Sequence, residues 1–369
     1  MSLPRPWAGC ALAEHGGADA GPPVAFDFST NACPLEPPQP VRRALQQADR
    51  RRYPDPGYTA LRAQLGAWLG VASERVLPTA GGSEAIRRLT LAARLRGVAR
   101  VWVPQPGYGD YRAAAEALGL EVRAYGDGGA LLRALAACGG EPSLVWLCEP
   151  CNPTGESLPA AFWQALAALP GRGTLLALDR AYEPLRLEGR DPVPPALADR
   201  AWQLWSPNKA LGLTGVRAGW AVAPARDDAL PAPRLEALAP SWVLSAEGVA
   251  LLQAWTLPAT QHGVHATCSR LRAWKRQQRA ALRALGWEQR PSVTPFWLAR
   301  PCEGGLARRL VALRAQGVKL RDATSFGLPG WVRLSVQPPP AQQALLDAWQ
   351  AADAAITSVE NSSASFLPS

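Results

Sequence analysis

Several residue types are scarce in this sequence of 369 residues. It has one methionine and three histidines, and only three of its 39 basic residues are lysines, namely Lys209, Lys275 and Lys319. No run approaches the roughly 20 consecutive apolar residues that a membrane-spanning helix needs. The first residues show no charged segment followed by an apolar one, so a secretory signal is not expected. These absences argue against a membrane protein and indicate a cytoplasmic one.

Cysteine is present, but without the pattern of a disulfide framework. The seven cysteines are an odd number with no repeating spacing, so we expect reduced thiols. Cys148 and Cys151 form one C-x-x-C pair, which is compatible with redox or zinc chemistry, and its only complement is the pair His262 and His265. A single pair of this kind does not make a metal site, so no metal is expected. The function of Cys148 and Cys151 stays open.

The net charge is positive, but it is not arranged for binding a nucleic acid. The sequence has 39 basic and 30 acidic residues, which gives a formal net charge of +9. The arginines are scattered singly along predicted helices, without a basic stripe or interleaved aromatic residues, so a nucleic-acid partner is not expected. The remaining explanations are an anionic small substrate and a coding bias of the genome toward arginine, which the scarcity of lysine favours.

The order of predicted elements indicates the fold class. A chain of 369 residues is expected to fold as two domains or as one large domain with appendages, and its 48% apolar and 19% charged residues argue against disorder over most of its length. Over residues 55–235, short apolar strands alternate with longer segments of helical period, which is typical of an α/β fold with a mainly parallel sheet. The predicted strands are 100–104, 120–125, 143–148, 174–179, 202–206 and 218–223, and the predicted helices are 83–96, 108–118, 130–137 and 160–169.

The remaining segments predict a second, smaller domain. A Pro-rich connector at 223–233 leads into a helical stretch at 246–285, followed by a strand at 293–299, a helix at 305–316, a strand at 330–336 and a helix at 340–355. This order is typical of an α+β domain. We therefore predict an N-terminal arm (1–44) that joins the small domain, a large domain (45–245), connecting helices (246–285), a small C-terminal domain (286–356) and a disordered tail (357–369).

Lys209 is the strongest candidate for chemistry. It follows a predicted strand and precedes a Gly-rich turn, a place where parallel α/β sheets present side chains to ligands. Burial lowers the pKa of an ammonium group, and a neutral amine can condense with an aldehyde such as that of pyridoxal phosphate. Arginine, which this chain otherwise prefers, is permanently protonated and could not do this. The alternative is a lysine on a surface loop.

Two further polar residues follow apolar strands. Asp179 ends the strand 174–179, and a buried carboxylate there needs a cationic partner, which a protonated pyridine nitrogen would supply. The alternatives are a helix cap or an ion pair with Arg180. Asn152 lies between Pro150 and Pro153, which fix the backbone, so its amide can donate to a phenolate-like oxygen.

Three other sites suit an anion or a planar ring. Gly82 and Ser83 lie in a Gly-rich turn at the start of a predicted helix, where free backbone N–H groups suit a phosphate, although an ordinary capping box is an equally good interpretation. Tyr108 follows a turn and either stacks on a ring or starts a helix half-buried. Arg333 lies inside an apolar strand, where its guanidinium can clamp a carboxylate through two hydrogen bonds.

Together and in this order, these segments resemble the aminotransferase class I/II family of fold-type I pyridoxal-phosphate enzymes. The resemblance covers nearly the whole chain and implies pyridoxal 5'-phosphate as the cofactor and a homodimer as the assembly. It makes Lys209 the lysine that attaches the cofactor, Asp179 the partner of the ring nitrogen and Tyr108 the stacking residue, the three expected catalytic residues. The expected cofactor-binding residues are Gly82, Ser83, Tyr108, Asn152, Asp179, Tyr182, Ser206, Lys209, Arg217 and, from the neighbouring subunit, Tyr53.

The N-terminal arm resembles one branch of this family more closely. His15-Gly16-Gly17 and the segment from Asp27 to Leu35 are similar to the threonine-phosphate decarboxylases of cobalamin biosynthesis, which are relatives of the histidinol-phosphate aminotransferases. This similarity implies a phosphorylated amino acid as substrate. Glu36 and Arg180 depart from the usual pattern of the family. The expected substrate-binding residues are Arg333, Arg321, His15, Asn31 and Asn152, with His15 and Arg321 as candidates for the substrate phosphate.

Three functions therefore stand side by side. The first is decarboxylation of L-threonine O-3-phosphate to (R)-1-amino-2-propanol O-2-phosphate and carbon dioxide. The second is an aminotransferase acting on histidinol phosphate, or on another amino acid with 2-oxoglutarate, and the third is a non-catalytic ligand sensor with the same fold. Because the bond held perpendicular to the cofactor ring is the one that breaks, substrate orientation decides between the first two.

Overall fold

The protein is organised around a seven-stranded sheet that is mainly parallel. The structure is a computed structural model that describes residues 15–137, 140–169, 173–226, 230–302 and 304–364. The strand order is β2-β8-β7-β6-β5-β3-β4, and only β8 runs antiparallel to its neighbours. This confirms the predicted fold class. The strands are β2 (Val76–Thr79), β3 (Arg100–Pro104), β4 (Glu121–Tyr125), β5 (Ser143–Cys148), β6 (Thr174–Asp179), β7 (Trp202–Trp205) and β8 (Gly219–Val222).

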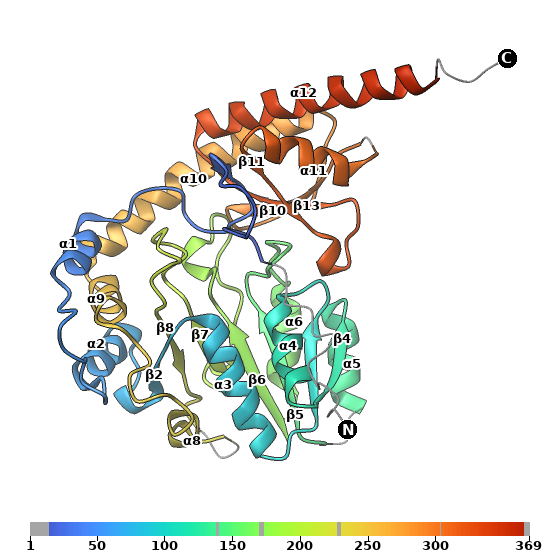
Figure 1. Ribbon diagram of the computed structural model, residues 1–369. Helices are drawn as coiled ribbons and strands as arrows, with labels where there is room; N and C mark the ends of the chain where they lie inside the picture. The colour runs from blue at the N-terminus through green and yellow to red at the C-terminus, as the bar shows by residue number, and fades with distance from the viewer. Residues whose placement is uncertain (1–14, 138–139, 170–172, 227–229, 303, 365–369) are drawn as a thin grey trace, which may run out of the picture.

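The central strands are buried on both faces. All six residues of β5 are buried, and successive side chains alternate between two apolar clusters. Leu144 and Trp146 pack in the cluster that contains α3 and α4, whereas Val145 and Leu147 pack in the cluster that contains α5 and α6. Helices cover both faces of the sheet, as Figure 1 shows. These helices are α3 (Gly82–Leu95), α4 (Gly109–Ala117), α5 (Gly128–Ala137), α6 (Ala160–Ala168) and α7 (Pro195–Ala198).

The predicted elements of this region are present, with ends shifted by one or two residues. The sequence analysis did not predict β2, which is only four residues long and contains Pro78. Proline is tolerated there because β2 is an edge strand with only β8 beside it. The short helices α1 (Gln39–Gln47), α2 (Thr59–Leu69) and α8 (Ala232–Glu236) were not predicted either.

A second, smaller sheet lies at the other end of the molecule. Its order is β12-β13-β10-β9, formed by β9 (Glu288–Gln289), β10 (Phe296–Arg300), β12 (Arg321–Asp322) and β13 (Val332–Ser335). The predicted strand at 293–299 begins three residues late. Pro295 has no N–H for a ladder, and the Ser292 and Thr294 hydroxyls donate to the Phe296 carbonyl at 2.5 and 2.9 Å. Figure 1 shows this sheet under α11 (Leu306–Ala315).

The N-terminal arm joins this smaller part. Strand β1 (Phe26–Asp27) pairs in parallel with β11 (Val318–Lys319), and the arm then runs on toward α1. Helix α9 (Ala246–Trp255) packs on α1, and the long α10 (Pro258–Ala284) links the two parts of the molecule. The exact domain boundaries stay predictions.

The last helix corrects the prediction for the C-terminal tail. We expected disorder over 357–369, but α12 extends over Pro339–Ala364, and the residues beyond it lie outside the described part of the chain. Between 354 and 364 the sequence has no glycine or proline, so nothing in it stops a helix. Helices α10 and α12 are long, yet across the described residues no helix is apolar enough along its length to traverse a bilayer.

Candidate active site

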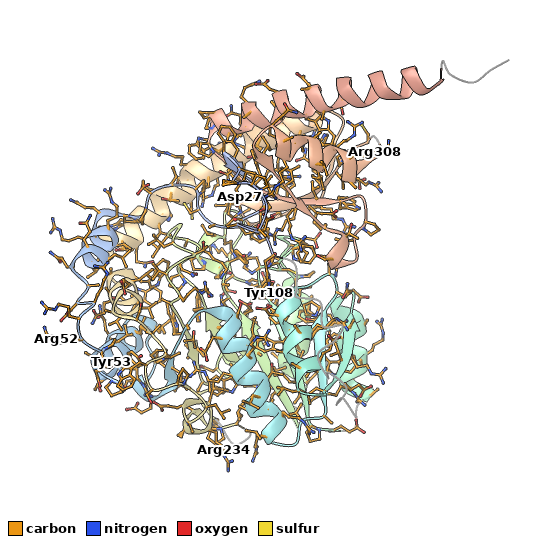
Figure 2. All side chains as sticks on the ribbon, viewed as in Figure 1. Asp27, Arg52, Tyr53, Tyr108, Arg234 and Arg308 are labelled. Carbon is orange, nitrogen blue, oxygen red and sulfur yellow. The ribbon has the colours of Figure 1, made fainter. Side chains whose placement is uncertain are left out.

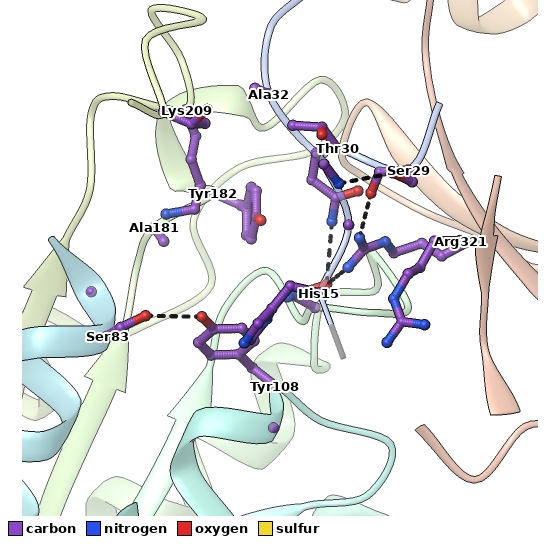
Figure 3. Close-up of a pocket in the computed structure, with 18 of the residues that line it drawn as sticks. His15, Ser29, Thr30, Ala32, Ser83, Tyr108, Ala181, Tyr182, Lys209 and Arg321 are labelled. Carbon is purple, nitrogen blue, oxygen red and sulfur yellow. Dashed lines mark hydrogen bonds between the residues drawn. The ribbon is translucent and has the colours of Figure 1, made fainter. Parts of the chain in front are cut away.

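One cavity of about 540 Å³ collects most of the predicted site residues. It lies between the carboxyl ends of the sheet strands, the N-terminal arm and the small sheet, and Figure 3 shows part of its lining. Its volume is in the range of ordinary small-molecule sites. Of the predicted residues, it is lined by His15, Asn31, Gly82, Ser83, Tyr108, Asn152, Asp179, Tyr182, Lys209, Arg217, Arg321 and Arg333. The topology brings them together because β2, β3, β5, β6 and β7 all run in one direction.

Lys209 presents its amine to this cavity from the turn after β7. Burial lowers the pKa of Lys209 to about 8, with the positive charge of Arg217 adding to the effect and Asp179 opposing it. Its Nζ atom lies 5.6 Å from the centroid of the Tyr182 ring, and no described residue accepts a hydrogen bond from it. A substantial share of this amine is therefore neutral near pH 8 and able to attack a carbonyl carbon.

Asp179 ends β6 and faces the same cavity. It is buried, and its carboxylate accepts hydrogen bonds from the Tyr111 hydroxyl at 2.7 Å and from the Ala181 backbone N–H at 2.9 Å. Burial raises the pKa of Asp179, while these bonds and the charge of Lys209 oppose the shift. Within the described part of the chain no basic side chain forms an ion pair with it. A cationic ring nitrogen would provide the missing partner.

The turn before α3 forms a cradle for an anion. The Gly82 backbone N–H points at the Ser206 hydroxyl at 3.1 Å, and a Cβ atom on Gly81 would lie 2.6 Å from the Arg217 guanidinium. Gly81 has a φ of 94°, which only glycine adopts readily, so the close approach and the turn both need glycine here. The helix N-terminus, the hydroxyl and the guanidinium together suit a phosphate group. Ser206 itself is buried behind the cavity lining.

Arg333 reaches the cavity from β13 and forms hydrogen bonds with Asn152, in the loop after β5, and with Ser29 in the N-terminal arm. Its guanidinium donates to Asn152 Oδ1 at 2.7 Å and to the Ser29 carbonyl at 2.7 Å, and the Asn31 amide also donates to Asn152 Oδ1 at 3.2 Å. Its Nε–H is buried and has no hydrogen-bond partner. Burial lowers the pKa of Arg333 to about 10, and the nearby charge of Arg321 adds to this. A bound carboxylate or phosphate would supply an acceptor for the Nε–H and would raise the pKa of Arg333 again.

Arg321 places a second guanidinium near the first. It lies on β12, opposite Arg333 on β13, and donates to the Ser325 hydroxyl at 2.6 Å. Both guanidinium groups lie near the Phe326 ring, with centroid distances of 5.0 Å for Arg321 and 5.6 Å for Arg333. Gln105 donates to the Phe326 carbonyl at 2.9 Å and so fixes this loop to the large sheet. The substrate end of the cavity therefore carries two adjacent positive charges.

Tyr108 and His15 form one wall of the cavity, as Figure 3 shows. The Tyr108 hydroxyl lies 3.0 Å from the Ser83 hydroxyl, and burial raises its pKa. The His15 ring lies 5.8 Å from the Tyr108 ring, and its Nε2 atom lies 3.7 Å from the Asp110 carboxylate. Tyr108 therefore lines the cavity, and its stacking role stays a prediction.

Tyr182 lies inside the site and Tyr53 lies outside it. Tyr182 is buried, packs edge-on against Phe296 at 4.7 Å and has a pKa raised by burial. Tyr53 is 77% exposed and stacks on Trp242 at 4.2 Å, and Figure 2 shows it at the outer edge of the molecule, away from Tyr108. Tyr53 therefore does not contribute to the cavity of its own chain.

The structure adds site residues that the sequence analysis missed. Tyr111 donates a hydrogen bond to Asp179 and stacks on Trp146 at 4.9 Å, and the Phe326 ring lies near both Arg321 and Arg333. Asp110 lies beside His15 and Ser29 beside Arg333. The only sequence signal for Tyr111 is its distance of three residues from Tyr108, one helical turn that is equally typical of core packing.

Cys148 and Cys151 are free thiols next to the cavity. Cys148 donates to the Pro150 carbonyl at 3.3 Å, and burial together with the neighbouring Cys151 raises its pKa. Hydrogen bonding lowers the pKa of Cys151. No group of three or more histidine, cysteine or acidic side chains in the described ranges could hold a metal ion.

Comparison with known proteins identifies the family. The sequence model described as aminotransferase class I and II matches residues 24–348. The chain belongs to this family. Histidinol-phosphate aminotransferase 2 of Caulobacter vibrioides is 30% identical over 356 residues, which cover 94% of this chain and 90% of that relative. Similar curated relatives are mostly histidinol-phosphate aminotransferases.

Two solved structures share the fold. Histidinol-phosphate aminotransferase from Sinorhizobium meliloti, in complex with pyridoxal-5'-phosphate, has a TM-score of 0.76 at 23% identity and covers 90% of this chain and 92% of its own. L-threonine-O-3-phosphate decarboxylase from Porphyromonas gingivalis has a TM-score of 0.71 at 25% identity, and the match covers 88% of this chain and 98% of the decarboxylase. Together the comparisons favour the aminotransferase alternative over the decarboxylase that the arm motif predicts.

The cavity fits the cofactor of this family. An unpaired buried carboxylate (Asp179), a partly neutral amine (Lys209) and an anion cradle around Gly82 face one space, and these are the groups that a pyridine nitrogen, an aldehyde and a phosphate require. The protein is therefore a pyridoxal-phosphate-dependent enzyme of the aminotransferase class I/II family, and pyridoxal phosphate is its cofactor.

Proposed function

We propose that this protein is an aminotransferase whose amino donor carries a phosphate group, with histidinol phosphate as the leading candidate. The observation that carries the proposal is Lys209, an amine with a pKa of about 8 in the same cavity as Arg321 and Arg333. Transamination needs a base that removes the proton from Cα, and a base works best when its pKa is close to the working pH. The aminotransferase relatives at 30% identity over most of the chain support the same conclusion.

In this proposal, each end of the cavity has a separate task. Bound pyridoxal phosphate supplies a sink for the electrons of the bond that breaks at Cα. Asp179 would hold a proton on the ring nitrogen, Asn152 and Tyr182 would donate to the ring oxygen, and Tyr108 would stack on the ring. Gly82, Ser83, Ser206 and Arg217 bind the cofactor phosphate. Lys209 would attach the cofactor through its amine and would act as the base that moves the proton at Cα.

The end of the cavity at Arg333 orients the substrate. Arg333 binds the anionic group next to Cα, which is a carboxylate in an amino acid and a phosphate ester in histidinol phosphate. Asn152 Oδ1 accepts from Arg333 and helps to hold it in place, and the Asn31 amide donates to the same oxygen. The bond at Cα that this anchoring aligned with the electron sink of the bound cofactor would be the one that breaks, and transamination would require that bond to be Cα–H.

Decarboxylation of threonine phosphate is the second candidate, and a specific observation favours it. Threonine phosphate has two anionic groups, and Arg333 and Arg321 offer two adjacent guanidinium groups on neighbouring strands. The arm adds His15 at the same end of the cavity. The Porphyromonas gingivalis decarboxylase, matched over 98% of its length, lends this candidate further support.

The assembly belongs to the proposal as well. Tyr53 is exposed and lies in an open groove of about 790 Å³ between α1, α2 and α9. We propose a homodimer in which Tyr53 reaches the cofactor phosphate of the neighbouring subunit.

A product assay on the purified, cofactor-loaded enzyme separates the two candidates. The proposal predicts that histidinol phosphate is consumed only when a 2-oxo acid such as 2-oxoglutarate is present, with glutamate as the second product. Release of carbon dioxide from threonine phosphate without any 2-oxo acid would reverse the ranking. Lys209→Ala is the control, because it retains the anion-binding arginines and loses the base.

A further inference from the structure

The contacts of the three lysines differ. Lys209 faces the cofactor end of the cavity, and Lys275 is buried, where it donates to the Ser292 carbonyl at 2.5 Å and pairs with Glu188 at 2.8 Å. The third, Lys319, lies on β11 with only 12% of its side chain exposed. It donates to the Gly17 carbonyl and pairs with the Asp19 carboxylate at 2.6 Å. Both partners belong to the N-terminal arm.

The arm is folded back on itself beside the cavity. The Gly17 backbone N–H donates to the Ser29 hydroxyl at 2.9 Å, and Gly17 has a φ of 96°. A Cβ atom on Gly16 would lie 1.9 Å from the Ser29 carbonyl oxygen and 3.0 Å from the Arg333 guanidinium. The first segment of the arm therefore lies directly against Ser29, whose carbonyl accepts from Arg333. This contact places His15 on the cavity wall.

Asp19 holds the arm against Arg314 and Lys319. Its carboxylate accepts two hydrogen bonds from the Arg314 guanidinium at 2.7 and 2.9 Å, as well as the bond from Lys319. The Gly21 backbone N–H adds a further bond at 2.9 Å. The fork of Arg314 and the ammonium of Lys319 hold the pKa of Asp19 well below its usual value. Such a paired arrangement holds its partners more firmly than a single exposed ion pair.

We propose that Asp19, Lys319 and Arg314 form a latch that positions the arm, and through it His15, for binding the anionic substrate. The three are positioning residues, since they act through His15 and Gly16. This inference rests on the proposed function for the identity of the ligand. It goes further by assigning part of the substrate affinity to residues outside the cavity, because none of the three lines it.

Lysine suits the latch better than arginine. The three N–H groups of an ammonium diverge, so Lys319 reaches the Gly17 carbonyl and the Asp19 carboxylate at once. A guanidinium is planar and directs its N–H groups in a fixed fork. In a chain with 36 arginines among 39 basic residues, retention of lysine here fits this geometric requirement.

The test uses Asp19→Asn in the cofactor-loaded enzyme, with two measurements. Hydrogen exchange of the peptide covering residues 15–30 reports the latch without reference to any reaction. Titration of the cofactor absorbance with histidinol phosphate, and separately with threonine phosphate, reports affinity for a phosphorylated substrate. We expect faster exchange in the arm, an affinity loss of about tenfold, an unchanged cofactor spectrum and a kcat within about twofold, with partial recovery in Asp19→Glu.

Asp199→Asn is the matched control. Asp199 also pairs with one arginine, Arg75 at 3.0 Å, and it is exposed to a similar degree, but it lies in the large domain away from the cavity. We expect this variant to keep the wild-type exchange and affinity.

Three results would overturn the latch: unchanged exchange in Asp19→Asn, faster exchange with unchanged affinity, or equal losses of affinity, kcat and cofactor binding. A wild-type enzyme that bound neither ligand would contradict the proposed function instead. In that case the exchange experiment would still decide whether Asp19 holds the arm.

Discussion

The two ends of the cavity are built in different ways. At the cofactor end, Asp179 is the last residue of the buried strand β6 and Lys209 lies in the turn after β7, so a single sheet fixes their positions. At the substrate end, His15 comes from the arm, whereas Arg321 and Arg333 come from the small sheet. The arm is held by a two-residue ladder with β11, by partly exposed ion pairs with Arg314 and Lys319, and by the bond from Arg333 to Ser29. Changes at the first end should affect chemistry, whereas changes at the second should affect affinity.

Loss of Lys209 should have the largest effect. Lys209→Arg retains the positive charge but is permanently protonated, so we expect kcat to fall by about 10³-fold or more and the cofactor to be held without a covalent bond. Turnover and the visible absorbance of the cofactor measure both effects. Lys275→Arg is the control on a second buried lysine, and it should retain the absorbance of the wild type.

Asp179→Asn should have the next largest effect on chemistry. An amide has the same shape as the carboxylate but no charge to hold a proton on the ring nitrogen, so we expect kcat to fall about 10²-fold. The KM for the amino donor should change little, because Asp179 lies at the cofactor end. A change confined to KM would contradict the claim that the cofactor end of the cavity affects chemistry and the substrate end affects affinity.

Arg333→Lys should show the opposite pattern. A lysine keeps one positive charge but loses the two-pronged geometry that Arg333 now uses toward Asn152 and Ser29. We expect KM for the amino donor to rise by about 10- to 100-fold, with cofactor loading unchanged. Steady-state kinetics together with a cofactor titration would detect a variant that instead lost its cofactor.

The pKa of Lys209 gives a prediction for the enzyme freed of its cofactor. Since the ordinary value is 10.5 and the folded value is about 8, the neutral amine is lost as pH falls through 8. The rate of covalent recombination with pyridoxal phosphate should therefore rise with pH and level off above about 8. A rate that still climbed steeply toward pH 10 would show an amine with an ordinary pKa.

The same division explains what the sequence could predict. Asp179 and Lys209 were found because apolar runs mark strands, and strand ends mark one edge of a parallel sheet. The Tyr111–Asp179 bond spans 68 residues, and the Lys319–Asp19 bond spans 300. No local pattern encodes such contacts, because they depend on how finished elements pack.

Asp19→Asn should give the smallest of these effects, about tenfold in substrate affinity, because the latch acts on the cavity only through the arm. This variant tests the difference between the two ends of the cavity, since it should weaken binding at the substrate end although Asp19 itself does not line the cavity.

The central claim is that the amine of Lys209 binds the cofactor. Borohydride reduction of the loaded enzyme, followed by peptide mass spectrometry, tests it directly, because the chain offers only three lysine side chains. The account predicts one reduced pyridoxyl group per chain, on the peptide that contains Lys209. Stoichiometric labelling of Lys275 or Lys319 instead, or no label on any of the three, would contradict it.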